Sequence, residues 1–340
     1  MKPITIIGGG LAGLSLGVAL RQRGVATTII EAGRYPRHRV CGEFISGAGG
    51  DLLRALGLDA LMRDQAQPAT DCAFFTPDRL LFHRPLPSAA ISVSRFHLDA
   101  ALAERFRSLG GELREGARCR EQNFGEGVVS AMGRRAQPVE NGWRWFGLKI
   151  HARGVALEAD LEMHLARDSY VGLCRLAGGE VNVCGLFRRR TNEPGRGESM
   201  SWLRGQPGSR LFQRLERAEF DEDSFCAVAG LSLRPQIIDP LTCRIGDALT
   251  MIPPITGNGM SMAFESAQLA LEPLAAYALG TKQWAVTTAE IAGALEQSFN
   301  ARLRWAGFLH RVLFSRFSAP VLGLLANSER GWRAAFAATR

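Results

Sequence analysis

The sequence lacks several features that would place it in a special class of protein. It has no run of eighteen consecutive apolar residues, so no membrane-spanning helix is expected. It has no CxxC pair, and its seven cysteines are an odd number, which argues against a zinc site and against a disulfide framework. The first apolar run begins at Ile4 and is broken at Gly8, too early for the core of a signal peptide. We therefore expect a protein of the cytoplasm.

Composition and charge exclude further classes. The 340 residues are 46% hydrophobic and 22% charged, which is ordinary globular composition. The length fits two domains, or one domain with an inserted subdomain. The net charge is +8, and residues 301–340 account for +6 of it, with seven arginines against Glu329. Because no basic stripe and no known binding motif runs through the body of the chain, a nucleic-acid partner is not expected.

The basic C-terminal segment has the pattern of an amphipathic helix. Its arginines alternate with leucine and aromatic residues, and Pro320 is expected to divide it into two pieces. Two roles fit: a helix that packs on the rest of the protein, which we favour, or a helix that lies on an anionic membrane. The second role would make the protein membrane-peripheral. The arginines are Arg302, Arg304, Arg311, Arg316, Arg330, Arg333 and Arg340.

The N-terminal residues predict a dinucleotide-binding unit of strand, helix and strand. Residues 3–7 and 25–31 are strand-like, and the apolar-periodic stretch between them ends near Gly24. The first strand and the helix are joined by a G-x-G-x-x-G motif consisting of Gly8, Gly10, Leu11, Ala12 and Gly13. Its glycines allow a tight turn, a close approach of a pyrophosphate, and close packing of helix on strand. Glu31 would accept hydrogen bonds from ribose hydroxyls and repel a 2′-phosphate, which favours NAD or FAD over NADP.

The rest of the chain predicts a second, antiparallel sheet and further helices. A helix is expected around 50–62, an antiparallel excursion over 72–93, and a helix that begins after Ser94 as its N-cap. Strand-like runs from Val128 to Phe187 predict the second sheet. We expect a helix over 209–219, a strand just before Gly246, and helices in the tail.

A second motif carries a resemblance to a known family. Gly246 and Asp247 follow a predicted strand, and a turn then leads into a helix through Pro254, Gly257, Asn258, Gly259 and Met260. This stretch resembles the second flavin motif of the p-hydroxybenzoate hydroxylase type of flavoprotein. The resemblance implies non-covalent FAD, with the Asp247 carboxylate on a ribityl hydroxyl and a helix N-terminus beside the isoalloxazine. Backbone N–H groups at such a terminus stabilise negative charge on a reduced flavin.

Two more segments look like other elements of the same superfamily. Tyr35 to Ser46 resembles the geranylgeranyl reductase and flavin-dependent halogenase branch, which implies that Arg39, Cys41, Gly42 and Glu43 line the flavin. Arg95, followed by Leu98 and Asp99, is similar to the family's R-x-x-L-D element, whose arginine reaches the cofactor. The cofactor-binding candidates therefore come from four separate segments of the chain.

The sequence departs from the family pattern at two places. The family's middle Asp-Gly motif is missing from the stretch Ser130 to Arg135 where it is expected. Because that motif supports nicotinamide access, we expect the electrons to come from a partner flavin reductase or from the substrate rather than directly from NAD(P)H. Trp143 and Trp145 resemble the start of the halogenase W-x-W-x-I-P signature, but Gly147 and Leu148 replace its last two residues. Halogenation is therefore not favoured.

The substrate pocket is expected to be apolar. Trp143, Trp145 and Tyr170 lie on strands that would form its floor, and Met251 could add adaptable apolar surface, although such residues also serve as ordinary core. Cys41 and the turn of Pro254, Gly257, Asn258 and Gly259 are the candidates nearest to the flavin. The histidines have no metal-ligand spacing, so no metal is expected, and no catalytic acid or base stands out.

These observations predict an α/β protein with a Rossmann-like, glutathione-reductase-type FAD domain, an antiparallel substrate domain and C-terminal helices. The FAD domain is assigned to residues 1–70, 91–135 and 225–300, the substrate domain to 71–90 and 136–224, and the helices to 301–340. The predicted function is FAD-dependent oxygenation or oxidation of an aromatic or lipid-like secondary metabolite. The alternatives are a C=C reductase similar to the geranylgeranyl reductases, and a lipid carrier without turnover on a flavoprotein scaffold.

Overall fold

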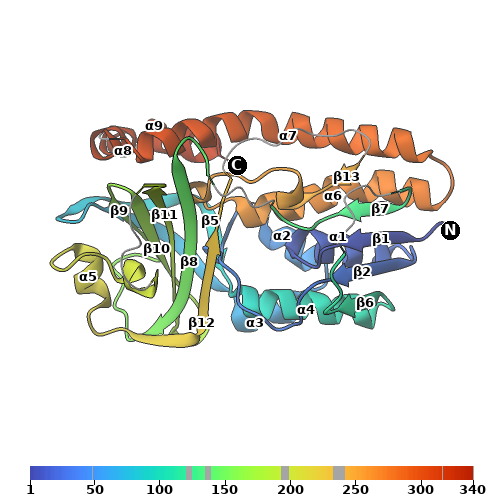
Figure 1. The fold of residues 1–340 in the computed structure, drawn as a ribbon, viewed down its shortest axis with the longest axis horizontal. Helices are drawn as coiled ribbons and strands as arrows, with labels where there is room; N and C mark the ends of the chain where they lie inside the picture. The colour runs from blue at the N-terminus through green and yellow to red at the C-terminus, as the bar shows by residue number, and fades with distance from the viewer. Residues whose placement is uncertain are drawn as a thin grey trace.

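The protein contains two sheets, a smaller parallel one and a larger mixed one, covered by helices (Figure 1). The computed structural model describes residues 1–47, 49–119, 125–134, 139–192, 199–232, 242–315 and 317–339. The smaller sheet has the strand order β13-β7-β1-β2-β6, and every pairing in it is parallel. Its strands are β1 (Ile4–Ile7), β2 (Thr27–Glu31), β6 (Glu112–Glu115), β7 (Val128–Ser130) and β13 (Cys243–Arg244).

The larger sheet has the strand order β12-β8-β11-β10-β9-β4-β5-β3. All its pairings are antiparallel except that of β4 with β9. Its strands are β3 (Phe44–Ser46), β4 (Gln67–Phe75), β5 (Leu80–Ser92), β8 (Trp143–Arg153), β9 (Leu161–Ala166), β10 (Ser169–Arg175), β11 (Val181–Arg190) and β12 (Glu219–Ala229). The predicted α/β fold with a second sheet is confirmed. The limits assigned to its domains stay a prediction.

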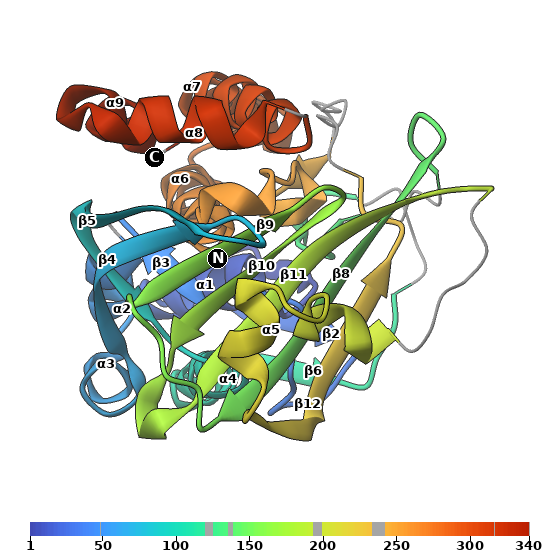
Figure 2. The same cartoon turned by 90° about the vertical axis from the view of Figure 1, so that its left-hand side faces the viewer.

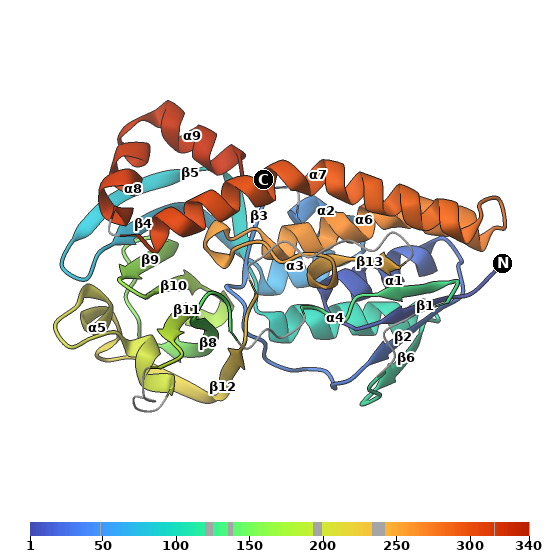
Figure 3. The same cartoon turned by 45° about the horizontal axis from the view of Figure 1, so that its top comes forward.

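The helices cover the parallel sheet and reach across to the larger one. The apolar faces of α1, α4, α6 and α7 pack with the parallel strands into the main core. The long helix α7 runs along one edge of the molecule and leads to α8 and α9, which lie against β5 at the far end (Figures 2 and 3). The helices are α1 (Leu11–Gln22), α2 (Gly49–Ala55), α3 (Asp59–Gln65), α4 (Arg95–Ser108), α5 (Arg210–Leu215), α6 (Gly259–Ala278), α7 (Trp284–Leu313), α8 (Ser318–Asn327) and α9 (Glu329–Ala337).

Local sequence patterns predicted most elements correctly, with several differences. The helix expected around 50–62 is divided into α2 and α3. The hydroxyl of Ser94 accepts from the Phe96 N–H and caps α4, as predicted. Val128–Ser130, expected in the second sheet, pairs instead with β1 in the parallel sheet. The helix predicted over 209–219 ends at Leu215, and the chain then enters β12, which pairs with β8.

The tail also differs from the prediction, because Pro320 does not divide it; the break between its helices lies before Ser318. The long helix α7 ends at Leu313, and Pro320 lies in the first turn of α8, where a proline is tolerated because the first helical N–H groups have no partner within the helix. Among the described helices, none combines the length and the apolarity needed to cross a bilayer. Arg316 and Arg340 lie outside the described residues.

Candidate active site

The G-x-G-x-x-G turn places one of its three glycines against an open cavity. Gly8 has a φ of +109°, and a Cβ there would lie 2.3 Å from the carbonyl oxygen of Ala131. A Cβ on Gly13 would lie 2.0 Å from the carbonyl oxygen of Gly8. A Cβ on Gly10 would meet no atom within 4 Å, and Gly10 borders the cavity together with Leu11 and Ala12. The first and third glycines therefore serve packing, and the second leaves room for a ligand at the N-terminus of α1.

The Glu31 carboxylate lies behind this turn and is already occupied by protein groups. It accepts from the N–H groups of Gly9 and Gly33, each at 2.7 Å, and it pairs with Arg37 at 2.5 Å. Burial alone would raise the pKa of Glu31, but the Gly33 N–H and the two arginines Arg37 and Arg39 together lower it. Glu31 does not border the cavity. In this arrangement the Glu31 carboxylate stabilises the conformation of the turn and is not exposed to a ligand in the cavity.

Asp99 brings the two predicted arginines to the same wall of the cavity. Its carboxylate is completely buried and accepts from Arg39 Nε at 2.8 Å and from Arg95 Nε and Nη2 at 2.7 and 2.9 Å. Both arginines border the cavity. The carboxylate fixes their guanidinium groups in position, so positive charge faces the cavity with little conformational freedom.

Asp247 is a cavity-lining carboxylate that makes no hydrogen bond with the residues the structure describes. It follows β13, where Gly246 has a φ of +58° and a Cβ on it would lie 2.8 Å from that of Ala12. Burial raises the pKa of Asp247, and Arg134 and Arg95 partly offset that rise. An acceptor of this kind is suited to a hydroxyl donated by a ligand.

Arg134 is a site residue that the sequence did not suggest. It follows β7 at the place where the family's Asp-Gly motif is missing, and it borders the cavity. Burial lowers its pKa, and the nearby Asp247 raises it. A cation therefore borders the cavity just after β7, in the stretch that lacks the expected Asp-Gly motif. Arg135, the next residue of the same stretch, lies outside the described residues.

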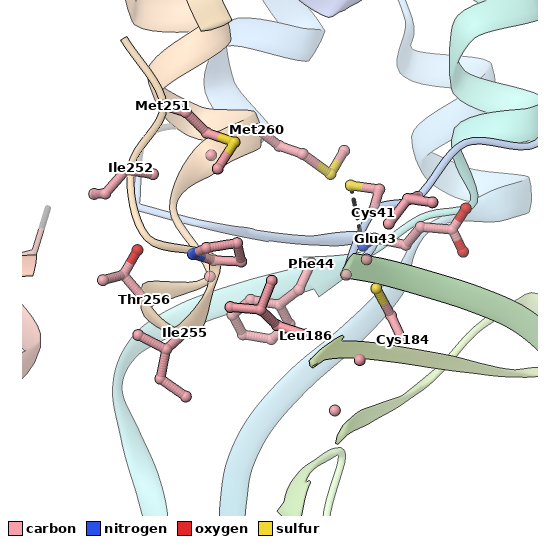
Figure 4. A pocket seen from close by; sticks show the side chains of 18 of the residues that line it. Cys41, Glu43, Phe44, Cys184, Leu186, Met251, Ile252, Ile255, Thr256 and Met260 are labelled. Atoms are coloured by element: carbon pink, nitrogen blue, oxygen red, sulfur yellow. Dashed lines mark hydrogen bonds between the residues drawn. The ribbon is translucent and has the colours of Figure 1, made fainter. Parts of the chain in front are cut away.

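The turn before α6 forms the opposite wall. Pro254–Thr256 form a short turn, Gly257 has a φ of +62°, and Gly259 begins the helix. The side-chain amide of Asn258 donates to the Thr339 carbonyl at 2.5 Å, so Asn258 ties the turn to the C-terminal end instead of facing the cavity. Met251, Ile255 and Thr256 lie on one side of the cavity, facing Cys41 and Cys184 on the other (Figure 4).

One cavity of about 840 Å³ joins these groups. The volume is within the usual range for small-molecule and cofactor sites. The predicted residues that border it are Gly10, Leu11, Ala12, Arg39, Cys41, Gly42, Glu43, Arg95, Tyr170, Asp247, Met251, Pro254, Gly257, Gly259 and Met260. The predicted residues that do not border it are Gly8, Gly13, Glu31, Trp143, Trp145, Gly246 and Asn258.

The cavity has a polar half and an apolar half. Its charged lining residues all come from the segment 37–43 and from Arg95, Arg134 and Asp247. The lining residues from β4, β5, β8–β12 and α7–α9 include no charged side chain, and we call this half the apolar chamber. They are Cys72, Phe74, Phe82, Leu86, Gly147, Leu161, Met163, Tyr170, Gly172, Cys174, Cys184, Gly185, Leu186, Cys226, Ala227, Val228, Ala229, Leu309, Leu313, Leu322, Trp332, Ala335 and Phe336.

Burial raises the pKa values of several side chains that line the apolar chamber. Burial raises the pKa of the Cys174 thiol to about 12 and raises that of Cys184 well above its usual value. Burial likewise raises the pKa of the Tyr170 hydroxyl, which has no hydrogen-bond partner among the described residues. Burial also raises the pKa of Cys41, whose sulfur accepts from the Glu43 N–H at 3.4 Å (Figure 4). These thiols are therefore poor nucleophiles at neutral pH.

The two tryptophans predicted for the pocket floor lie elsewhere. The guanidinium groups of Arg188 and Arg190 each lie 4.3 Å from the ring centre of Trp143. Trp145 packs edge-on against Phe314, with ring centres 4.9 Å apart, and its ring centre is 5.0 Å from that of His310. Trp145 thus helps to fix the larger sheet to the end of α7, whereas Trp143 packs against arginines of its own sheet.

Glu43 belongs to a buried polar cluster with His151, Lys149 and His38 that the sequence did not predict. The Glu43 carboxylate is fully buried, accepts from the Arg95 N–H at 2.8 Å, and lies 2.7 Å from His151 Nε2 and 3.8 Å from Lys149 Nζ. Lys149 Nζ in turn lies 3.0 Å from His38 Nδ1, and burial lowers the pKa of His38 to about 4. Through Glu43, the cluster links β8 of the larger sheet to the first residue of α4. Within the described residues, no group of three or more His, Cys, Asp or Glu is placed to hold a metal ion.

Comparison with known proteins agrees with the predicted cofactor. Residues 1–139 match the family model described as FAD binding domain. A search of curated protein sequences finds no match. Among solved structures, halogenase PltM is 15% identical, with 95% of this chain and 79% of that chain covered and a TM-score of 0.74. Flavin-dependent brominase Bmp2 is 17% identical, with 99% and 92% covered and a TM-score of 0.74.

Two further structures extend this picture. PqsL of P. aeruginosa, solved in complex with 2-aminobenzoylacetate, is 17% identical, with 94% of this chain and 99% of that chain covered and a TM-score of 0.71. A variant of PltM, solved in complex with FAD, is 14% identical, with 95% and 79% covered and a TM-score of 0.74. At these identities the likeness shows a shared fold. The predicted fold class is confirmed, and the match of residues 1–139 to the FAD binding domain agrees with the predicted superfamily.

Proposed function

We propose that this chain, which carries the FAD binding domain and the fold of the FAD-dependent oxidoreductase superfamily, oxygenates or oxidises a small, apolar, aromatic or lipid-like substrate. The observation that carries the proposal is the division of one cavity into a polar half, bordered by the dinucleotide motif, and an apolar chamber without charged side chains. FAD supplies the electron and oxygen chemistry when bound, and the protein supplies position, electrostatics and exclusion of water.

The polar half fits FAD in three respects. The open space at Gly10 and the N-terminus of α1 suit a diphosphate. The arginines Arg39, Arg95 and Arg134 put positive charge on the same wall. The Asp247 carboxylate, with no hydrogen-bond partner among the described residues, is available to a ribityl hydroxyl. These residues would hold the cofactor, and they account for every charged group of the cavity outside the segment 37–43.

The apolar chamber favours an uncharged substrate. A charged substrate would lose its hydration there without gaining a partner, which is strongly unfavourable. The groups in the chamber that could exchange a proton are thiols and the Tyr170 hydroxyl, and burial raises the pKa values of Tyr170, Cys174 and Cys184. Reduction of an isolated C=C bond requires a proton donor at the carbon, whereas oxygen transfer to an activated ring makes smaller demands on a protein acid. This difference supports oxygenation over alkene reduction.

The alternatives make different predictions. A C=C reductase similar to the geranylgeranyl reductases is favoured by the Cys41, Gly42 and Glu43 segment, all of which borders the cavity. A halogenase has the same fold, as PltM and Bmp2 show, but Trp143 and Trp145 lie outside the cavity here. A lipid carrier would fill the chamber without turnover.

The test is a reaction of FAD-loaded protein, reduced without oxygen by a separate flavin reductase and then mixed with air. A panel of apolar phenols and polyenes is present in one arm, and bromide is added in another. We expect oxygen uptake coupled to a hydroxylated or oxidised product. Saturation of a C=C bond under anaerobic conditions, a brominated product, or substrate binding without any product would each contradict the proposal.

A further inference from the structure

The outer side of the last helices carries exposed apolar and basic residues together. Phe308 on α7, Phe317 between the helices and Leu324 on α8 are 43%, 54% and 73% exposed. Arg304 and Arg311 are also exposed, and with Phe308 they follow the spacing i, i+4 and i+7 on one side of α7. We call these five residues the C-terminal face. Exposed apolar side chains that cluster beside cations are typical of a surface that binds another protein or a membrane.

Some arginines of α7 and α9 form ion pairs within the protein, and others form none. Arg302 pairs with Glu265 at 2.7 Å, and Arg333 pairs with Glu329 at 2.7 Å. Arg304, Arg311 and Arg330 form no ion pair with the residues the structure describes. The ten residues of α8 include no charged side chain. Glu329, at the start of α9, is the single acidic residue of positions 301–340. The free cations thus flank an uncharged helix.

The same helices form a wall of the apolar chamber on their other side. Leu309 and Leu313 of α7 and Leu322 of α8 border the cavity, as does Trp332 of α9. The indole N–H of Trp332 donates to the Pro85 carbonyl at 2.9 Å, which fixes α9 against β5. The wall is therefore only one layer of helices thick. On one side of it lies the chamber, and on the other side lies the C-terminal face.

We propose that the C-terminal face docks on the surface of an anionic lipid bilayer and that the apolar substrate enters the chamber from the bilayer through the wall formed by α7 and α8. This inference rests on the proposed function, because it takes the substrate to be apolar. The free arginines match the charge of lipid phosphates, and the exposed Phe317 and Leu324 match the acyl boundary. Each arginine near an anionic leaflet strengthens binding by roughly fivefold.

The test is co-sedimentation of the full, FAD-loaded chain with vesicles of phosphatidylglycerol and phosphatidylcholine, compared with vesicles of phosphatidylcholine alone. The first variant is Arg304→Gln with Arg311→Gln, and its control is Arg63→Gln with Arg118→Gln, which removes the same charge from exposed positions on α3 and beyond β6. The second variant is Phe317→Ser with Leu324→Ser. Its control is Leu279→Ser with Val286→Ser, at exposed positions at the other end of α7.

We expect the wild type to bind the anionic vesicles and the first variant to bind them roughly 30-fold more weakly. The wild type should bind vesicles of phosphatidylcholine alone more weakly than the anionic ones. The second variant should bind both kinds more weakly than the wild type does, and both controls should bind as the wild type does. Equal binding by variants and controls would overturn the proposal, as would a C-terminal face that only drives self-association of the chain in the absence of vesicles.

FAD content and turnover of a dispersed, water-soluble substrate are measured on each variant. If these stay normal while vesicle binding is absent, the docking proposal fails and the proposed function stands; if the wild type binds no FAD, the proposed function fails.

Discussion

The contrast between Gly10 and Gly13 gives a direct test of which residues the cofactor touches. A Cβ on Gly10 points into open space, and Gly10 is an N-cap with extended backbone that alanine can adopt. Replacing an N-cap glycine by alanine should cost the flavin-free fold no more than about 1 kcal/mol. The same methyl occupies the space into which a diphosphate must fit, so Gly10→Ala should weaken FAD by at least ~10-fold, or about 1.4 kcal/mol.

Gly13→Ala should behave in the opposite way. Its Cβ would lie 2.0 Å from the carbonyl oxygen of Gly8, a backbone atom that cannot move aside freely. Overpacking of this kind destabilises a fold by about 1–3 kcal/mol. Denaturant unfolding of the flavin-free proteins gives the stability, and fluorescence titration gives the FAD affinity, with Gly293→Ala at an exposed position of α7 as the control. Unchanged FAD affinity in Gly10→Ala would refute the placement of the diphosphate.

Three further outcomes follow from the site. Asp247→Ala should weaken FAD by roughly 10- to 150-fold, equivalent to about 1.5–3 kcal/mol, because it removes a charge-assisted hydrogen bond; unchanged retention of FAD on gel filtration would count against that role. Because the expected Asp-Gly motif is missing from Ser130 to Arg135, NADH or NADPH alone should reduce the flavin more slowly than about 1 s⁻¹, a low turnover rate, and faster bleaching in stopped flow would show this expectation to be wrong. Burial and the nearby Arg188 lower the pKa of His310 to about 4 from 6.5, so the unfolded chain binds a proton first as the pH falls. The wild type should therefore lose up to about 3 kcal/mol of stability between pH 6.5 and pH 4 relative to His310→Phe, and parallel stability curves for the two proteins would contradict this.

Local patterns were enough to predict the parts of the fold that depend on neighbouring residues. The turn at Gly8, Gly10 and Gly13 is set by backbone sterics within a few residues, and the Ser94 cap by one side chain and one N–H. Strand periodicity gave the second sheet, because one face of each strand is buried. It did not give the partner of Val128–Ser130, since a short apolar run looks alike in either sheet.

The parts that were missed depend on contacts between distant residues. Glu43 and His151 are 108 positions apart, and nothing in either local sequence indicates that they meet. The spacing of Trp143 and Trp145 places them on one face of a strand and predicts that they lie at the substrate, but it does not say what covers that face. Arg188 and Arg190 of β11 and Phe314 at the end of α7 cover it. The stretch that contains Arg134 is marked in the sequence only by the missing Asp-Gly motif, which does not indicate that Arg134 borders the cavity.

The most direct test of the account is a calorimetric titration of folded, flavin-free protein with FAD, and with FMN and NAD as matched ligands. FMN lacks the adenosine half that the Gly10 turn and α1 should hold, and NAD lacks the isoalloxazine expected beside the turn at Pro254–Thr256. We predict one FAD per chain, with FMN and NAD each binding at least ~10-fold more weakly. Absence of FAD binding by the folded protein, or binding of NAD as tight as that of FAD, would contradict the central claim that this cavity is a flavin site.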